Sequence, residues 1–315
     1  MSIGITLQAP PTTDNYVDAV VGMARKAAAA GVRAAWFGQR FDYDAVALAG
    51  IVGREVPTLQ VGTSGVPIFG RLPLLVGGQA QTAQAATAGR FHLGIGLGAG
   101  PFVESTLGVP HTRPIARLRE FLTALRPFLE TGRTEHRGDL ITAFTPMPSA
   151  LPGATPPVPI LVAAMGPQAL RVTGELADGT LPLLAGPRVL AEHIVPPLLK
   201  AAAGRPAPRV VAGIHALVTD DVDATRERAV AQISFLDQFP SYQRVLNLGG
   251  FTSGAELAAI GDEKLVAATI RDYFNAGATE VIVSNAFGAP ADQERTWRLL
   301  GELSAAHDRN VVTGA

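Results

Sequence analysis

The sequence contains no cysteine among its 315 residues, and this absence excludes several kinds of chemistry. Without thiols the chain cannot form disulfides, thiolate metal sites or a cysteine nucleophile. Charge is also sparse, at 17% of residues with a formal net charge of -1, and the lysines and arginines are scattered. A nucleic-acid partner normally requires a basic stripe that neutralises phosphates. We therefore expect no nucleic-acid partner.

Long hydrophobic runs are missing too, although the mean hydropathy is positive at +0.23. A run such as Ala45 to Gly53 is about half of the roughly 20 residues that a bilayer span requires. The segment from Met1 to Pro11 lacks the basic stretch that begins a signal peptide. The sequence therefore predicts a cytoplasmic protein with no membrane partner. Its 47% hydrophobic residues are enough for a large core.

Short apolar segments alternate with amphipathic, alanine-rich ones along the chain. The predicted strands are Ile3–Gln8, Arg33–Gly38, Leu59–Thr63, Phe91–Leu97, Pro159–Ala163, Gly179–Leu183, Val210–Leu217 and Glu280–Ser284. The predicted helices are Asp14–Ala30, Asp42–Arg54, Leu72–Ala88, Pro114–Glu130, Gln168–Leu176, Val189–Ala203, Asp221–Leu236, Asp262–Asn275 and Ala291–Ala306. Such alternation indicates parallel strands with helical crossovers. Units of about 40 residues favour a closed (β/α)8 TIM barrel, with a doubly wound open sheet as the alternative.

Two segments depart from this alternation. Residues 132–144 carry a Gly-Asp pair among β-prone residues and predict a hairpin or an extended excursion. The proline-rich stretch after it cannot form a regular helix. Residues 239–260 are glycine-rich and predict an irregular excursion, either a wall over the functional face of a barrel or an ordinary surface loop. No linker divides the chain. We expect one domain over residues 1–315, with excursions near 132–158 and 239–260.

Common catalytic motifs are absent: the chain has no GxxxxGK[ST], HExxH or GxSxG, and its six histidines lack metal-ligand spacing. The run from Gly94 to Ala99 matches the relaxed dinucleotide fingerprint GxGxxA. That fingerprint requires a helix to begin at the loop, whereas Gly100-Pro101 and later prolines predict a delayed helix. We interpret these glycines as the end of a strand where a flat ring can approach the backbone.

Three motifs with their spacing carry a family resemblance. The first is Gly62-Thr63-Ser64, then Arg71-x-Pro73, then Thr87 to Arg90 followed by Leu-Gly-Ile-Gly. The second joins Ala163–Pro167 to Gly174–Gly179, and the third is Ala35–Gln39. Together they resemble the luciferase-like monooxygenase superfamily from Ile3 to about Pro290, in the branch described as dependent on coenzyme F420.

This resemblance implies a barrel with a non-prolyl cis peptide at Ser64–Gly65, behind an isoalloxazine-type ring. It implies that Gln39, Thr63, Ser64, Gly65 and Gly96 contact the ring of the cofactor. It also implies a phosphate site at Gly166, Pro167 and Gly179, because a helix amino terminus favours anions. F420 is the expected cofactor. FMN is the alternative, because it also carries a phosphate and this motif does not distinguish the two.

The catalytic residues are less typical of the family. Several F420-dependent relatives carry an Asp-His pair where this chain has Gln39 and Arg40. Arg40 could orient an anionic substrate or polarise a carbonyl, or it could pair with Asp42 or Asp44. Glu104 and His111 are candidates for proton delivery, with ordinary loop residues as the alternative reading. His215 and Phe251 are predicted to bind substrate.

Three functions follow from these observations. The first is an F420-dependent oxidoreductase that transfers a hydride between C5 of the deazaflavin and a small organic substrate. The second is an FMN-dependent monooxygenase on the same barrel, and the third is a non-catalytic protein that binds flavin or deazaflavin. A homodimer is expected by analogy with the family.

Overall fold

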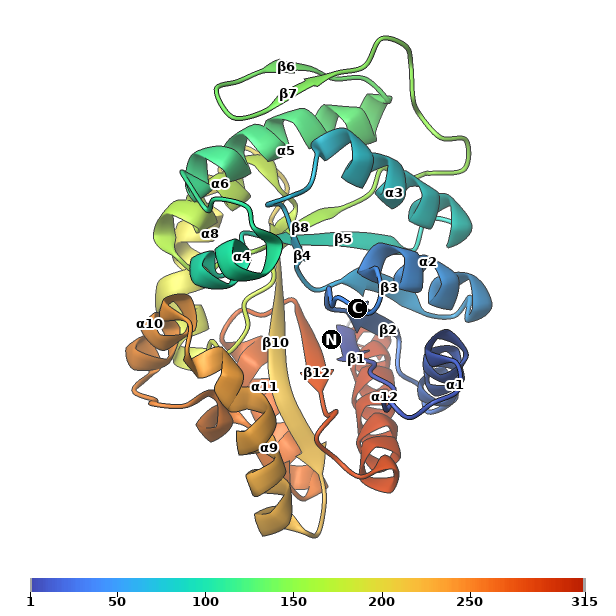
Figure 1. Cartoon of the computed structure of the whole chain (residues 1–315). Coiled ribbons are helices and arrows are strands. Elements are labelled where there is room, and N and C mark those ends of the chain that lie inside the picture. Colours follow the sequence, from blue (N-terminus) through green and yellow to red (C-terminus); the bar gives the residue numbers. More distant parts are fainter. Residues whose placement is uncertain (1, 314–315) are drawn as a thin grey trace. The chain divides into compact units, whose positions relative to one another are not determined.

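The computed structural model describes residues 2–313, with side chains described as far as residue 307. The chain forms two compact units. Unit 1 comprises Met1–Trp36, Pro182–Val195 and Val210–Ala315, and unit 2 comprises Phe37–Leu181 and Pro196–Arg209. In each unit parallel strands alternate with helices (Figure 1), as the pattern of short apolar and amphipathic segments predicted.

Unit 1 contains a parallel sheet with the strand order β11 (Ala259–Gly261), β10 (Arg209–Val218), β12 (Glu280–Ser284), β1 (Ser2–Thr6) and β2 (Ala34–Phe37). Its helical elements are α1 (Tyr16–Ala29), α7 (Pro187–Val189), the π-helical turn η1 (Leu190–Ile194), α9 (Val222–Asp237), α10 (Pro240–Gly249), the 3-10 turn η2 (Gly254–Leu257), α11 (Glu263–Asn275) and α12 (Pro290–Thr313). Side chains alternate along the strands, so Ile3, Ile5, Val281 and Val283 share one fully buried face.

Unit 2 contains parallel strands in the order β3 (Gln60–Thr63), β5 (Phe91–Gly96), β8 (Ile160–Ala163) and β9 (Gly179–Thr180). The short strand β4 (Val66–Pro67) also pairs with β5. β3 pairs with the beginning of β5 and β4 with its carboxyl end, so both lie along one edge of β5. The chain therefore bends between them, at Ser64–Gly65.

The helices of unit 2 are α2 (Ala45–Glu55), α3 (Pro73–Ala86), α4 (Gly100–Leu107), α5 (Pro114–Thr131), α6 (Pro167–Leu176) and α8 (Val195–Ala201). α5 buries an apolar stripe at three- and four-residue spacing, formed by Leu118, Phe121, Leu122 and Leu125. α3 packs closely against it, because a Cβ at Gly77 would lie 2.4 Å from the Phe128 ring.

Three of the sequence predictions are decided by these elements. The predicted hairpin is confirmed: β6 (Glu135–Arg137) pairs antiparallel with β7 (Thr142–Phe144), beyond α5 in Figure 1. The irregular excursion over residues 239–260 is wrong, because Pro240 begins α10 and Gly250 ends it with a left-handed φ of 83°. The delayed helix after β5 is wrong as well. α4 begins at Gly100, since a proline in the first turn costs no hydrogen bond.

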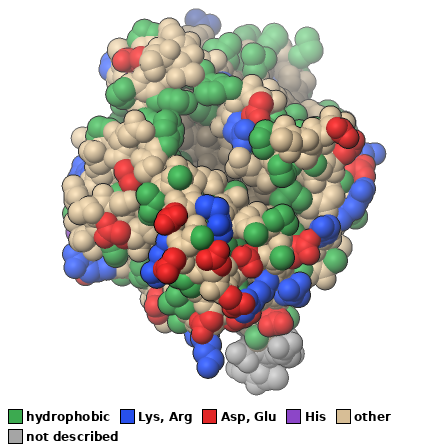
Figure 2. Space-filling view, turned by 60° about the horizontal axis from the view of Figure 1, so that its bottom comes forward, with side chains coloured by type: hydrophobic (Ala, Val, Ile, Leu, Met, Phe, Trp, Pro, Cys, Tyr) green, Lys and Arg blue, Asp and Glu red, His purple; other side chains and the backbone are tan. Residues whose placement is uncertain are grey.

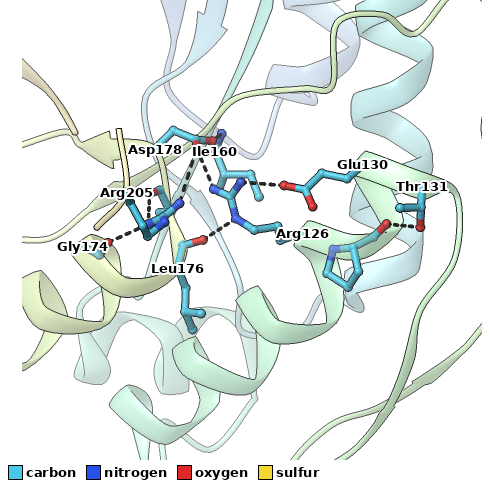
Figure 3. A network of polar contacts seen from close by, with 10 residues as sticks. Arg126, Glu130, Thr131, Ile160, Gly174, Leu176, Asp178 and Arg205 are labelled. Carbon is cyan, nitrogen blue, oxygen red and sulfur yellow. Dashed lines mark hydrogen bonds and ion pairs between the residues drawn. The ribbon is translucent and has the colours of Figure 1, made fainter. Parts of the chain in front are cut away.

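A polar network lies at the amino-terminal ends of β8 and β9 (Figure 3). The Asp178 carboxylate accepts hydrogen bonds from the Ile160 backbone N–H at 2.7 Å and from Arg126 at 2.7 Å. Arg126 also donates to the carbonyl of Leu176 and to Glu130. Arg205, 3.8 Å from Asp178, donates to the carbonyls that end α6. One carboxylate thus connects α5, the end of α6 and the beginning of β8.

We expect Asp178→Asn to destabilise the protein by about 2–3 kcal/mol, because two partly buried guanidinium groups lose their common carboxylate. Urea unfolding followed by circular dichroism measures the change. Asp139→Asn is the matched control: Asp139 pairs with Arg113 at 3.3 Å, but both side chains are largely exposed. We expect Asp139→Asn to lower the free energy of unfolding by less than about 1 kcal/mol. Equal effects of the two substitutions would contradict the structural role of Asp178.

Candidate cofactor site

The carboxyl ends of β3, β4, β5 and β8 lie together at one edge of the sheet in unit 2. Gly96, the last residue of β5, is paired with Ala163 on β8 and with Pro67 on β4. In parallel α/β folds, ligands bind outside this end of the strands. The side chains and backbone groups at this edge therefore form the candidate site.

Three glycines lie on one face of this edge. Gly62, Gly94 and Gly96 lie at positions that alternate along β3 and β5 onto the same face. Gly94 is required by close packing, since a Cβ there would lie 1.9 Å from the Thr63 carbonyl oxygen. A Cβ at Gly96 would make only ordinary contacts, 3.5 Å from the Ala163 Cβ and 3.8 Å from the Gly65 Cα. Gly96 itself is buried, and a Cβ would fit there without displacing a neighbour.

Ser64 and Gly65 form the bend next to this surface. The Ser64 backbone N–H donates to the Phe37 carbonyl at 2.9 Å, which fixes the bend to the end of β2. The Ser64 side chain is half-buried, and its hydroxyl makes no hydrogen bond within the described part of the chain. A hydroxyl donor is thus available at the bend, where Gly65 lies beside Gly96.

The amino end of α6 follows the carboxyl end of β8. Gly166 is the residue before the helix and Pro167 is its first residue. Leu170 N–H donates to the Gly166 carbonyl, which leaves the N–H groups of Gln168 and Ala169 without helical partners. A Cβ at Gly166 would have no heavy atom within 4 Å. The end of α6 is consequently accessible to an anion.

His111 stands beside the end of β5. Its Nε2 lies 3.2 Å from the carbonyl oxygen of Leu97, and its ring packs on Phe69 with centroids 4.3 Å apart. Its backbone N–H donates to Glu104 at 2.9 Å, and the Glu104 side chain is exposed on α4. Glu104 thus holds the loop that carries His111. It does not point at a buried reaction centre.

Comparison with known proteins identifies the family. The family model described as luciferase-like monooxygenase matches residues 1–280. This chain belongs to that family.

Individual relatives match at low identity. The chain is 29% identical to an uncharacterised protein of Mycobacterium tuberculosis, over 64% of this chain and 63% of the relative's length. It is 25% identical to the 5,10-methylenetetrahydromethanopterin reductase of Archaeoglobus fulgidus, over 80% of this chain and 84% of the reductase.

Solved structures share the fold. The coenzyme F420-dependent tetrahydromethanopterin reductase of Methanopyrus kandleri superposes with a TM-score of 0.76 at 21% identity, over 95% of this chain and 97% of the other. A Baeyer–Villiger monooxygenase component of Pseudomonas putida, in complex with FMN, gives 0.73 at 16% identity over 96% of each chain. The predicted family and the predicted (β/α)8 barrel are both confirmed.

The cis peptide that the luciferase-like family implied is absent. Within residues 2–313 the only cis bond joins Thr155 and Pro156, so the bond between Ser64 and Gly65 is trans. Gly65 makes the bend with a φ of 115°, a conformation that residues with a Cβ rarely adopt. Glycine at this position thus replaces the cis bond as the means of turning the chain.

Two of the residues predicted to contact the ring are engaged elsewhere. The Thr63 hydroxyl donates to the Gly94 carbonyl and accepts from the Gly94 N–H, both at 2.9 Å, so its proton is not available to a ligand. The Gln39 amide donates to the carbonyls of Arg40 and Tyr43 and accepts from Arg71. Both side chains organise the backbone around the edge, and their contact with a ring stays a prediction.

The catalytic role predicted for Arg40 is not supported by its contacts. Its guanidinium donates to both oxygens of Asp42, at 2.9 and 2.8 Å. Hydrogen bonding from Arg40 lowers the pKa of the Asp42 carboxyl, which keeps that carboxyl ionised. The structure therefore supports the alternative, a structural ion pair between Arg40 and Asp42.

Gly179 lies far from the phosphate site that the family motif implied. It begins β9 opposite Leu161, two residues before the carboxyl end of β8. A Cβ at this position would lie 2.2 Å from the Arg209 carbonyl oxygen, so glycine is needed for packing. The motif Gly174–Gly179 belongs to the Asp178 network at the amino-terminal ends of the strands. Residues at the amino-terminal end of a barrel contribute to stability and not to the active site.

The two predicted substrate-binding residues lie in unit 1. His215 is paired with Ser284 at the carboxyl ends of β10 and β12, and its ring lies 6.3 Å from that of Phe287. Phe251 packs against the hydrophobic cluster that includes Leu184 and Leu246, which indicates a structural role for its ring.

Sequence reasoning missed Arg117, on the first turn of α5. Its guanidinium lies 5.1 Å from the centre of the Phe69 ring. The Nε atom is fully enclosed and has no hydrogen-bond partner. Three arginines at the start of one helix (Arg113, Arg117 and Arg119), with no acid in its first turn, were the signal available in the sequence.

Other kinds of site find little support among the described residues. No group of three or more His, Asp or Glu side chains in this part of the chain could hold a metal ion. No described helix is long and apolar enough to cross a membrane. On the face drawn in Figure 2, acidic and basic side chains are interspersed, without a basic stripe. A pocket of about 220 Å³ beside Arg126 and Asp178 lies at the amino-terminal ends of the strands, away from the candidate site.

Burial lowers the pKa of His215 to about 4. We therefore expect NMR titration to find this imidazole neutral at pH 6. In the unfolded chain its pKa returns to about 6.5, so unfolding takes up a proton between these values. Stability should fall as the pH drops from about 6.5 towards 4, and His215→Gln should reduce this dependence. An imidazole that titrates near its ordinary pKa would contradict the burial of His215.

Proposed function

We propose that this chain is an F420-dependent oxidoreductase acting on a small organic substrate such as an alcohol, an imine or an activated alkene. The observation that carries the proposal is the end of β5, where Gly96 and the half-buried Gly65 place no Cβ atom beside the free Ser64 hydroxyl. A flat tricyclic ring can lie against such a surface, because no Cβ atom intervenes.

The residues at this edge fit a flavin-like cofactor with a phosphorylated side chain. Ser64 can donate its hydroxyl proton to a ring carbonyl, and Gly65 and Gly96 provide the surface behind the ring. The free N–H groups at the start of α6, next to Gly166 and Pro167, can hold a phosphate. F420, when bound, supplies hydride-transfer chemistry at C5 of its deazaflavin. His215 remains our proposed substrate-binding residue.

The choice of F420 rests on the nature of the relatives. The relative matched over most of its length is a methylenetetrahydromethanopterin reductase, and a matching structure is a reductase described as F420-dependent. The second candidate, an FMN-dependent monooxygenase, is favoured by the FMN complex of the Pseudomonas putida enzyme with the same fold. A non-catalytic binding protein is the third candidate, since Arg40 and Glu104 have structural partners.

Titration of the protein with F420 and with FMN, followed by fluorescence and thermal shift, separates these candidates. We expect micromolar binding of F420 and no comparable binding of FMN. Binding of FMN alone would contradict the proposal and support a monooxygenase. Tight F420 binding without turnover on alcohols, imines or activated alkenes would support the non-catalytic protein.

We expect Gly166→Asp to weaken F420 binding by about tenfold or more, because it sets a carboxylate against the phosphate at the start of α6. The backbone there has room for the side chain, so the fold should be retained. Gly22→Asp is the matched control, since Gly22 on α1 is equally open. Undiminished affinity in Gly166→Asp would refute the phosphate site.

We also propose a homodimer formed through α3. No charged residue occurs between Arg71 and Arg90. Leu72 and Leu75 project outward with 61% and 66% of their surface exposed. Ile51 on the adjacent helix α2 is exposed as well. Such an uncharged apolar surface on two adjacent helices is typical of a protein–protein contact.

Leu75→Glu is expected to convert the dimer into a monomer, because the partner would have to bury an unpaired carboxylate. Light scattering after size-exclusion chromatography measures the mass. Leu265→Glu, on α11, changes another exposed leucine and should leave the dimer intact. A wild-type protein that is monomeric at micromolar concentration would refute this proposal.

A further inference from the structure

Arg117 differs from the other arginines at the start of α5. Arg113 pairs with Asp139 at 3.3 Å, and Arg119 donates to Glu175 at 2.5 Å. Arg117 has no carboxylate within pairing distance and no hydrogen-bond partner for its side chain within the described part of the chain. Its Nε is nevertheless enclosed, and an enclosed donor without a partner is unfavourable.

The surroundings hold this cation in one place. The Arg117 guanidinium lies 5.1 Å from the centre of the Phe69 ring, which is itself 1% exposed. The His111 ring also packs on Phe69, with the ring centroids 4.3 Å apart. An arginine packed on an aromatic ring loses little further freedom when it binds an anion.

His111 connects this cluster to the candidate cofactor site. Its Nε2 faces the carbonyl oxygen of Leu97, the residue that follows Gly96. Its Nδ1 faces Gly100, where an added Cβ would lie only 3.1 Å away. Glu104 accepts from the His111 backbone N–H and does not pair with Arg117. The cluster is therefore cationic and adjoins the edge where the ring is proposed to bind.

Two helices contribute further positive potential. α4 begins at Gly100 and α5 at Pro114, and neither has an acidic residue in its first turn or a side-chain cap. Helix amino termini carry a partial positive charge. They add to the fixed charge of Arg117, so an acidic group at this position is stabilised by several sources at once.

We infer that Arg117, with His111, forms a second anion subsite that receives the acidic tail of the deazaflavin cofactor. This inference rests on the proposed function. F420 carries carboxylates beyond its phosphate, linked through a phosphodiester, whereas FMN ends at a single phosphate. The start of α6 holds the phosphate, and the Arg117 cluster holds a carboxylate of the tail. The cluster thereby selects F420 over FMN.

The test compares the binding of three ligands by the wild-type protein and by variants of the arginines at the start of α5. The ligands are F420, its riboside precursor without phosphate or tail, and FMN, each titrated by fluorescence with and without inorganic phosphate as a competitor. The proteins are the wild type, Arg117→Met and Arg113→Met. The two variants each remove one positive charge from the start of α5, but only Arg117 lacks a carboxylate partner.

We expect Arg117→Met to weaken F420 binding by about tenfold or more and to leave binding of the riboside unchanged within about twofold. Arg113→Met should change F420 affinity by less than about threefold. Arg117→Lys should restore part of the affinity, because it keeps the charge without the planar donors. If Arg117→Met does not fold, Arg117→Gln and the salt dependence of F420 binding to the wild type supply the same comparison.

The contradicting results are distinct. Wild-type affinity for F420 in folded Arg117→Met would overturn the subsite while leaving the proposed function intact. Equal loss of F420 and riboside binding would also overturn it, because Arg117 would then act through the fold. Loss of turnover with F420 affinity unchanged would assign the anion to the substrate instead. A wild-type protein that does not bind F420 would overturn both the subsite and the proposed function.

Discussion

The close approach of β3 and β5 determines the character of the candidate site. Their backbones meet at Gly94, where a Cβ would lie 1.9 Å from the Thr63 carbonyl oxygen, and the Thr63 hydroxyl bonds to both backbone groups of Gly94. A Cβ therefore has no room at position 94, where the Leu181 side chain also packs. The chain then bends at Ser64–Gly65 and continues as β4 along the same edge. The result is a rigid surface of backbone at the end of β5, which is the feature that a flat cofactor ring requires.

The opposite ends of the same strands are built for stability. Asp178 collects Arg126, Arg205 and the Ile160 backbone N–H, and thereby fixes α5 and α6 to the beginning of β8. Buried or partly buried charges of this kind are costly unless each is paired. The polar groups at the carboxyl ends differ, because the Ser64 hydroxyl and the Arg117 Nε have no partner. Both of these donors lie where a ligand is proposed to bind.

The sequence predicted the fold well because the alternation of apolar and amphipathic segments is a local property. The hairpin at 132–144 could also be predicted from local residues. The errors have specific causes. α4 and α10 were missed because prolines that begin a helix were taken as signs of its absence. Gly179 was assigned to the wrong end of a strand, since a glycine needed for packing and one needed for a ligand look the same in sequence. The roles of Arg40 and Arg117 depend on partners that only the fold brings near.

We propose that a deazaflavin lies on the backbone surface at the ends of β5 and β8. Hydrogen–deuterium exchange of the protein with and without saturating F420 tests it most directly. We expect slower exchange in three segments that are separate in sequence. They are the Ser64–Val66 bend, residues 97–102 at the start of α4, and the first turn of α6 at Gln168–Ala169. Unchanged exchange rates in all three segments at saturating F420 would contradict this placement of the cofactor. Protection of only those segments that are remote from this edge would contradict it as well.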